Sequence, residues 1–519
     1  MSQNGVQCSG WQMSLISMLL SGGIMLFFAV GLSVEDADAQ SYSELWGKNG
    51  EQWHSKSRLP DFSRAGYHNG ELEIPEVVVR ANVKDFGAVG DGVADDTRAF
   101  KEAIAATDEG AIEIPPGRYV LAEPLHIKKR GIVLRGAGPD HTILVIPKSL
   151  QQLLPADQFT ALGVPKLKYS FGGAFIEVRG NDGLEKVGDI TAPSQRGDQV
   201  LVCENAGEVR PGSWIQLRQM LNEEMGLHMH AGLDAGDDTL ARPRAVEWVA
   251  RVVQVDGDQV MVDRPLRLDV RPEWRATLHF YRPTVEEVAI EGLAFEFPGV
   301  PKKKHLLEEG FNAIQFSDVF NCWVKNVRFI DADMGLKVNG ARFCQGEELE
   351  FVEAKREGMT GHHAIWASGN AQECLFQGFR VETTYVHDLT VEGLANGNVF
   401  RNGSGRSINL DHHRNAPYEN LFTNLDVGDP KRLWRSSGRG DRGPHSAART
   451  TAWNLRHQGG EVHEPSRPSK MWPQLNVVGV AGYEEKKSDE RWTEPLSGIV
   501  DPPDIYQAQL ERRLAEEGR

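Results

Sequence analysis

Histidines, carboxylates and an arginine recur at matching positions of four short apolar segments, residues 335–339, 364–368, 388–392 and 407–411. When the segments are aligned on their apolar residues, one polar column precedes them and consists of His363, His387 and Arg406. A second polar column ends them and consists of Asn339, Ser368, Glu392 and Asp411. Imidazole exchanges protons near neutral pH, and stacked carboxylates perturb each other's pKa. The two columns therefore predict a site for acid–base chemistry.

Positive charge follows the second column directly. Asp411 is succeeded by two histidines and an arginine, and a glycine-rich stretch further on carries more arginines. Guanidinium groups bind carboxylate or sulfate groups with paired hydrogen bonds. We therefore expect an anionic substrate to be bound by His413, Arg414, Arg435, Arg439 and Arg442. The protein as a whole has a net charge of -16, which argues against nucleic acid as a partner.

The four aligned segments belong to the coils of a repeat. Successive coils begin at Cys322, Cys344, Cys374 and Asn398, with spacings of 22, 30 and 24 residues. We expect the cysteines to form a buried thiol stack, with disulfides or metal ligation as the alternatives. The alternation within the strands places in a common interior Leu336, Ile365, Leu389 and Ile408. Stacked strands lie about 4.8 Å apart, so side chains of neighbouring coils share one surface. The pattern predicts a solenoid of parallel β-strands.

Residues 85–104, DFGAVGDGVADDTRAFKEAI, predict how the solenoid begins. Asp95, Asp96 and Thr97 can cap a helix, and the residues that follow give that helix an apolar stripe. Such a helix would cover the open end of the first coil. Together with PPGRY at 115–119 and LRGAG at 134–138, this segment resembles the start of the pectate-lyase-like right-handed parallel β-helix superfamily, of the rhamnogalacturonase/epimerase-like pectate lyase type.

The resemblance implies an all-β fold, a right-handed parallel β-helix with an N-terminal capping helix, and activity on polysaccharides. It does not transfer catalytic residues. The paired aspartates of polygalacturonase-like hydrolases are not found in the sequence, and neither is the lysine and arginine motif of alginate or chondroitin lyases of this shape. The candidate residues therefore rest on the alignment of the coils.

Two enzymatic mechanisms fit these candidates. In β-elimination from a uronate-containing glycan, His363 or His387 would be the base, Arg406 would neutralise the uronate carboxylate, and His412 would protonate the leaving oxygen. In hydrolysis, Glu392 and Asp411 would be the acid and its partner. The histidines and the basic stretch favour a polysaccharide lyase over a glycoside hydrolase. A non-catalytic glycan-binding or cell-surface protein is the third alternative.

The rest of the chain divides by composition. Residues 1–39 resemble a signal peptide, with an apolar run at 15–32 and a small-x-small pattern at 37–39. No lysine or arginine precedes Lys48, so retention as an anchor is the alternative. We expect an extended arm over 40–81, the β-helix over 82–460 with a β-rich insertion at about 180–285, and a last coil with a helical tail over 461–519.

These features predict a secreted or periplasmic protein with no stable membrane span after signal cleavage, and we expect a monomer. No metal-ligand motif is recognisable in the sequence. Acidic columns can hold calcium, so calcium is the one candidate cofactor, although no calcium-binding loop is recognisable.

Overall fold

The computed structural model describes residues 42–519, with gaps at 156, 160–164, 302–305, 357–360, 460–461, 463–470 and 496–497. All described residues belong to one structural unit. The expected signal peptide lies outside the described residues. Within the described ranges, no helix has the length and apolar character needed to cross a membrane.

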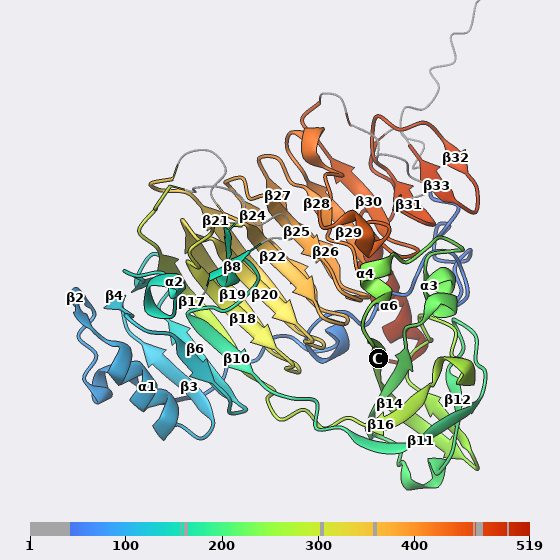
Figure 1. Ribbon diagram of the computed structural model, residues 1–519, viewed down its shortest axis with the longest axis horizontal. Helices are drawn as coiled ribbons and strands as arrows, with labels where there is room; N and C mark the ends of the chain where they lie inside the picture. Colours follow the sequence, from blue (N-terminus) through green and yellow to red (C-terminus); the bar gives the residue numbers. More distant parts are fainter. Residues whose placement is uncertain are drawn as a thin grey trace, which may run out of the picture. The chain divides into compact units, whose positions relative to one another are not determined.

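Two sheets of mainly parallel strands form the solenoid, and the chain alternates between them (Figure 1). The first sheet has seven described strands: β5 (Leu125–Ile127), β10 (Ile176–Arg179), β18 (Asn312–Ser317), β20 (Met334–Asn339), β22 (His363–Ser368), β25 (His387–Val391) and β28 (Leu410–His412). Every neighbouring pair in this sheet is parallel. Parallel neighbours need a crossover, and strands of the second sheet supply it.

The second sheet has eighteen described strands. The coils contribute β1 (Val79–Asn82), β3 (Gly110–Ile114), β6 (Ile132–Gly136), β17 (Ala289–Glu296), β19 (Trp323–Ile330), β21 (Gln345–Val352), β23 (Leu375–Gln377), β24 (Arg380–Val381), β26 (Val399–Arg401), β27 (Ser404–Gly405), β29 (Leu421–Asp426), β30 (Thr451–Arg456), β31 (Leu475–Val478) and β33 (Arg491–Glu494). The others are β2 (Asp91–Asp95), β4 (Gly117–Val120), β7 (Thr142–Val145) and β32 (Lys486–Lys487). The long strands bend where Gly292 and Asn326 adopt the left-handed conformation, with φ of 61° and 53°.

Side chains of successive coils stack in the interior. Phe329 lies between Phe295 and Phe351, with ring centroids 5.9 and 4.9 Å away. The predicted thiol stack is also present, because Cys344 interacts with the coil-related cysteines on either side and all three are free and buried. These stacks confirm the predicted all-β solenoid.

A helix covers the first coils. Helix α1 (Thr97–Ala106) buries Ala99, Phe100, Ala103 and Ile104 against the solenoid core. Asp96 occupies the N-cap position but makes no side-chain cap hydrogen bond. Its carboxylate instead accepts the N–H groups of Val89 and Gly90, which closes the glycine-rich turn before the helix.

The insertion between the two halves of the solenoid is a closed antiparallel barrel of six strands. They are β11 (Glu185–Ala192), β12 (Val200–Cys203), β13 (Trp214–Met220), β14 (Ala245–Asp256), β15 (Gln259–Val262) and β16 (Thr277–Phe280), around a core of their own. Two short helices connect β13 to β14, namely α3 (Glu223–Met229) and α4 (Asp237–Leu240). Buried arginines of the barrel join it to the coils, since Arg267 pairs with both Glu373 and Glu419.

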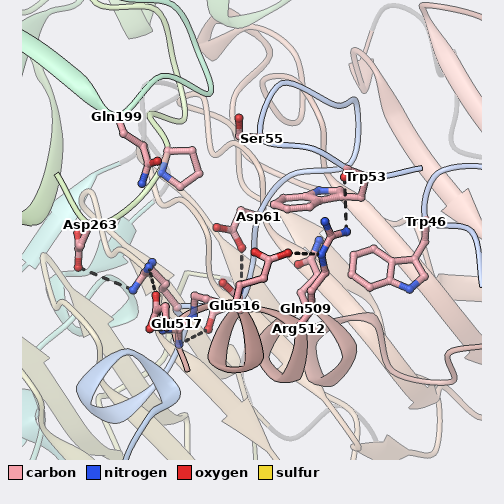
Figure 2. A pocket seen from close by; sticks show the side chains of 14 residues that line it. Trp46, Trp53, Ser55, Asp61, Gln199, Asp263, Gln509, Arg512, Glu516 and Glu517 are labelled. Atoms are coloured by element: carbon pink, nitrogen blue, oxygen red, sulfur yellow. Dashed lines mark hydrogen bonds and ion pairs between the residues drawn. The ribbon is translucent and has the colours of Figure 1, made fainter. Parts of the chain in front are cut away.

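The arm packs against the C-terminal helix. Residues 42–78 contain little regular structure apart from η1 (Tyr67–Gly70), and helix α6 (Ile505–Glu516) shares a core cluster with Trp46 and Phe62. The guanidinium of Arg512 lies 5.8 Å from the Trp46 ring and 5.4 Å from the Trp53 ring. Figure 2 shows these side chains beside a cavity of about 300 Å³ between the arm, the barrel and α6. The residues that line this cavity do not include the predicted site residues.

Candidate active site

The strands that position the predicted site are only partly in the predicted register. His363 pairs with His387 and Ile365 with Leu389, as the alignment predicts. The fourth strand is displaced by two residues, because Leu389 pairs with Leu410 and Thr390 with Asp411. Glu392 and Asp411 are therefore not register partners, and the predicted stacked carboxylate pair is wrong. Leu410, rather than Ile408, continues the inward row of Leu389.

Arg406 is not beside the histidines. It follows β27 in the second sheet, its side chain is 58% exposed, and its Nη1 lies 3.1 Å from Glu353 Oε1. The prediction that Arg406 falls in register with His387 is wrong. Because the strand is displaced by two residues, Leu410 and Asp411 occupy the positions that the alignment gave to Ile408 and Asn409.

His412 faces the interior of the solenoid. It pairs in register with Val391, and its ring packs against Phe422 and Trp472 at centroid distances of 5.5 and 4.4 Å. Burial lowers the pKa of His412 to about 3. A neutral core imidazole cannot reach a glycan, so the predicted role of His412 as the acid is not supported.

Four imidazoles and one carboxylate gather on the outer side of β22, β25 and β28. His362, His363 and His387 are buried, and His413 is 16% exposed at its side chain. The ring centroids of His363 and His387 lie 4.8 Å apart, and those of His387 and His413 also 4.8 Å apart. His362 was not predicted as a site residue, and its only signal in the sequence is its position directly before the aligned column.

Asp411 lies between two of these imidazoles. Its Oδ2 accepts a hydrogen bond from His413 Nδ1 at 2.9 Å and lies 3.2 Å from His387 Nδ1. Its Oδ1 accepts the Ser437 N–H at 2.9 Å. Burial by itself would raise the pKa of Asp411, but the two histidines and these hydrogen bonds hold it well below its usual range. Burial opposes protonation of His413, and the Asp411 carboxylate outweighs it and raises the pKa of His413.

An aromatic wall closes the buried side of the cluster. The Trp366 indole stacks on the His363 ring with a centroid distance of 4.1 Å, and Lys337 Nζ lies 3.6 Å from the centre of the Trp366 ring. Lys337 Nζ donates to the Phe171 carbonyl at 2.7 Å. Burial lowers the pKa of Lys337 to about 8. Both residues occupy outward positions of strands that the alignment identified, but they were not predicted as site residues.

The basic stretch lies beside the half-buried edge of the cluster. Arg442 Nη1 lies 2.9 Å from Glu392 Oε1, and its Nε lies 3.1 Å from Asp238 Oδ2 in α4. Arg414 Nε donates to the Gly438 carbonyl at 3.2 Å. Glu392 thus has an arginine partner, and the barrel's connecting helix contributes a carboxylate to this edge.

The two outer arginines of the stretch are more exposed. Arg439 pairs with Asp441, and the Arg435 side chain is exposed while its backbone carbonyl accepts the Asn409 amide at 2.7 Å. The structure therefore brings His413, Arg414 and Arg442 to one edge and leaves Arg435 and Arg439 at the surface.

Part of the chain matches a family model. Residues 80–161 match the model described as "Rhamnogalacturonase A/epimerase, pectate lyase-like". Among curated relatives, mannuronan C5-epimerase AlgE3 of Azotobacter vinelandii is 30% identical over 128 residues, which are 22% of this chain and 7% of that protein. Mannuronan C5-epimerase AlgE4 of the same organism is 40% identical over 72 residues, 12% of this chain and 13% of that protein. The chain thus spans a small part of these relatives.

Two solved structures show a likeness to this chain at low sequence identity. The tailspike protein gp49 from Pseudomonas phage LKA1 has a TM-score of 0.46 and 12% identity, over 77% of this chain and 67% of that chain. The A-module of mannuronan C-5 epimerase AlgE6 of Azotobacter vinelandii has a TM-score of 0.31 and 10% identity, over 82% of this chain and 100% of that chain. The family match covers the first coils, residues 80–161, and the two sheets of the described residues have the parallel β-helix architecture that the resemblance implies.

Proposed function

We propose that the protein acts on a polysaccharide and cleaves an anionic, uronate-containing glycan by β-elimination. The observation that carries the proposal is the hydrogen bond from His413 Nδ1 to Asp411 Oδ2 at the partly exposed edge of the cluster. A carboxylate on Nδ1 fixes the tautomer that leaves Nε2 able to accept a proton. His413 is therefore the proposed base, and Asp411 is its positioning partner.

The arginines supply the other requirement of this chemistry. A proton α to a carboxylate becomes acidic only when the carboxylate's charge is neutralised as the proton leaves. Arg442 and Arg414 lie at the same edge as His413 and can bind the uronate carboxylate. The proton passes to His413, and the electron pair of the broken carbon–hydrogen bond forms the new carbon–carbon double bond. The leaving oxygen departs with the proton that His413 returns.

The buried members of the predicted site have supporting roles in this proposal. His387 contacts Asp411 from the closed side, and His363 lies behind it. We assign both histidines to positioning rather than to contact with the glycan. Hydrolysis through Glu392 and Asp411 has less support, because Glu392, the acid in that prediction, is paired with Arg442, and the two carboxylates are not register partners.

A second candidate reaction is epimerisation at the carbon that carries the uronate carboxylate. The two relatives are named mannuronan C5-epimerases, and removal of the same proton begins both reactions. The two outcomes differ only in whether the proton is replaced or the leaving oxygen departs. Both need the same base and the same neutralising arginines.

The test is incubation of the purified protein with a panel of uronate-containing polysaccharides. Ultraviolet absorbance of unsaturated uronates and release of reducing ends are followed together. We expect both signals to rise with the parent protein. The His413→Gln variant should show neither signal, whereas His126→Gln, a change at an exposed histidine, should show both. Reducing ends alone would mean hydrolysis, altered sugar configuration without cleavage would mean epimerisation, and affinity without any chemical change would mean a binding protein.

A further inference from the structure

Three buried histidines face one another behind the proposed base. His363 and His387 are register partners at the first positions of β22 and β25, and His362 directly precedes the first of them. One ring nitrogen of each of the three lies within 4.8 Å of a ring nitrogen of the other two. All three are at most 2% exposed. Two adjacent coils therefore fix three imidazoles around one point.

Each of these rings has an oxygen beside its Nδ1 atom. His363 Nδ1 lies 2.9 Å from Thr390 Oγ1, His362 Nδ1 lies 3.4 Å from Glu308 Oε2, and His387 Nδ1 lies 3.2 Å from Asp411 Oδ2. Histidines that ligate metals almost always donate their other ring N–H to a carboxylate, a backbone carbonyl or a water. One nitrogen of each ring therefore lies beside an oxygen, a contact that also accompanies metal-bound histidines.

The carboxylate that orients His362 is itself held in place. Glu308 is buried, and its Oε2 accepts a hydrogen bond from Ser170 Oγ at 2.7 Å. Thr390 and Asp411 are likewise fully buried and occupy neighbouring strands of the same sheet. The three oxygens therefore form a rigid outer layer around the imidazoles.

We propose that His362, His363 and His387 bind one divalent transition-metal ion of the zinc class. Three ring nitrogens separated by at most 4.8 Å lie no more than about 2.8 Å from their common centre, so shifts of under about 1 Å bring them to zinc–nitrogen bond lengths. Imidazole donors select zinc, copper, nickel or iron over calcium and magnesium. The site goes beyond the proposed glycan chemistry and does not depend on it.

The alternative is a metal-free cluster of hydrogen-bonded histidines. The sequence pattern does not separate the two, because the ligands come from different coils and lack the short spacing of a helical or loop metal motif. The two alternatives differ in metal content, which can be measured without any substrate.

The first measurement uses full-length protein produced without a histidine tag. Metal-free protein is prepared by dialysis against a chelator and is then titrated with zinc sulfate or cobalt chloride. We expect one tightly bound ion per chain and a Tm that rises until one equivalent of metal has been added. With cobalt, we expect visible absorption bands typical of a low coordination number with nitrogen ligands. No change in Tm with either metal, together with less than one-tenth of an equivalent bound, would overturn the proposal.

Variants locate the ion. His363→Asn and His387→Asn should each weaken zinc affinity by at least about tenfold. His126→Asn is the matched control, because it removes an exposed histidine from β5 of the same sheet, and it should bind zinc as the parent does. If a variant fails to fold, the titration of the parent protein still decides whether an ion binds. Equal zinc affinity in all three folded variants would place the ion elsewhere and refute this site.

Discussion

Thr390 and Asp411 are register partners on the adjacent strands β25 and β28. Both point outward, and each contacts a histidine of a neighbouring position: the Thr390 hydroxyl lies 2.9 Å from His363 Nδ1, and the Asp411 carboxylate accepts from His413 Nδ1 at 2.9 Å. One column of side chains therefore orients imidazoles on both sides of it. The orientation of His363 and of His413 therefore depends on Thr390 and Asp411 respectively.

Asp411→Asn should reduce activity by about 1,000-fold or more, because an amide in this position stabilises the wrong tautomer of His413. The measurement is the rate of unsaturated uronate formation at saturating glycan, with Tm followed in parallel. Asp256→Asn, an exposed aspartate at the end of β14, is the control and should keep full activity. An active Asp411→Asn protein would remove Asp411 from the mechanism.

The neighbours His412 and His413 should separate stability from activity. His412→Ala removes a ring buried against Phe422 and Trp472, and we expect a loss of about 2–4 kcal/mol in the free energy of unfolding. His413→Gln should leave the free energy of unfolding nearly unchanged and lower kcat by about 100-fold or more. Denaturant unfolding measures the effect on stability, and initial rates measure the effect on activity. Loss of activity without loss of stability in His412→Ala would support the predicted role of His412 as the acid.

Arg442→Ala and Arg406→Ala should differ in their effect on substrate binding. Arg442 lies beside Glu392 at the edge of the cluster, and we expect its loss to raise KM for an anionic glycan by about tenfold. Arg406 is a surface residue paired with Glu353, so its loss should leave KM unchanged and cost at most about 0.5 kcal/mol of stability. A larger KM effect from Arg406→Ala would contradict this placement of the binding edge.

The junction between barrel and solenoid should make folding sensitive to acid. Burial alone would raise the pKa of Glu419, but Arg196, Arg449 and Arg267 outweigh it and lower the pKa to about 2. A carboxyl with a lowered pKa in the folded state stabilises the protein above its ordinary pKa of 4.5, and this contribution disappears as the pH falls from there towards 2.

We expect this loss to reach roughly 3 kcal/mol, measured by denaturant unfolding at a series of acidic pH values. Glu419→Gln should flatten that part of the profile, whereas Glu208→Gln, at an exposed position of the barrel, should leave it unchanged. If the parent and Glu419→Gln profiles ran parallel, the carboxylate would not be the source of the acid sensitivity.

The cysteines should be unreactive in the folded protein. Burial raises the pKa of the Cys203 thiol to about 12 and those of Cys344 and Cys374 well above their usual range, and only the thiolate reacts. A thiol reagent applied to the chain from residue 40 onward should label none of the four remaining cysteines until denaturant is added. Rapid labelling of one thiol under native conditions would show that its coil opens.

The solenoid could be predicted from the sequence. Alternating apolar residues, the coil starts at Cys322, Cys344, Cys374 and Asn398, and the segment 85–104 are local signals that do not depend on distant contacts. They placed the strands at 335–339, 364–368 and 388–392 in the register that the structure has. The outward histidines His363 and His387 followed from that register.

The register of β28 and the residues that meet at the exposed edge of the site could not be predicted from the sequence. Inward and outward positions repeat every two residues, so a displacement of two keeps Ile408, Leu410 and His412 on the inner face in either register. Sequence alternation cannot detect such a slip, and packing of the whole coil selects one register. The meeting of Arg442 with Glu392 and Asp238 joins residues 50 and 204 positions apart, and only the folded chain brings them together.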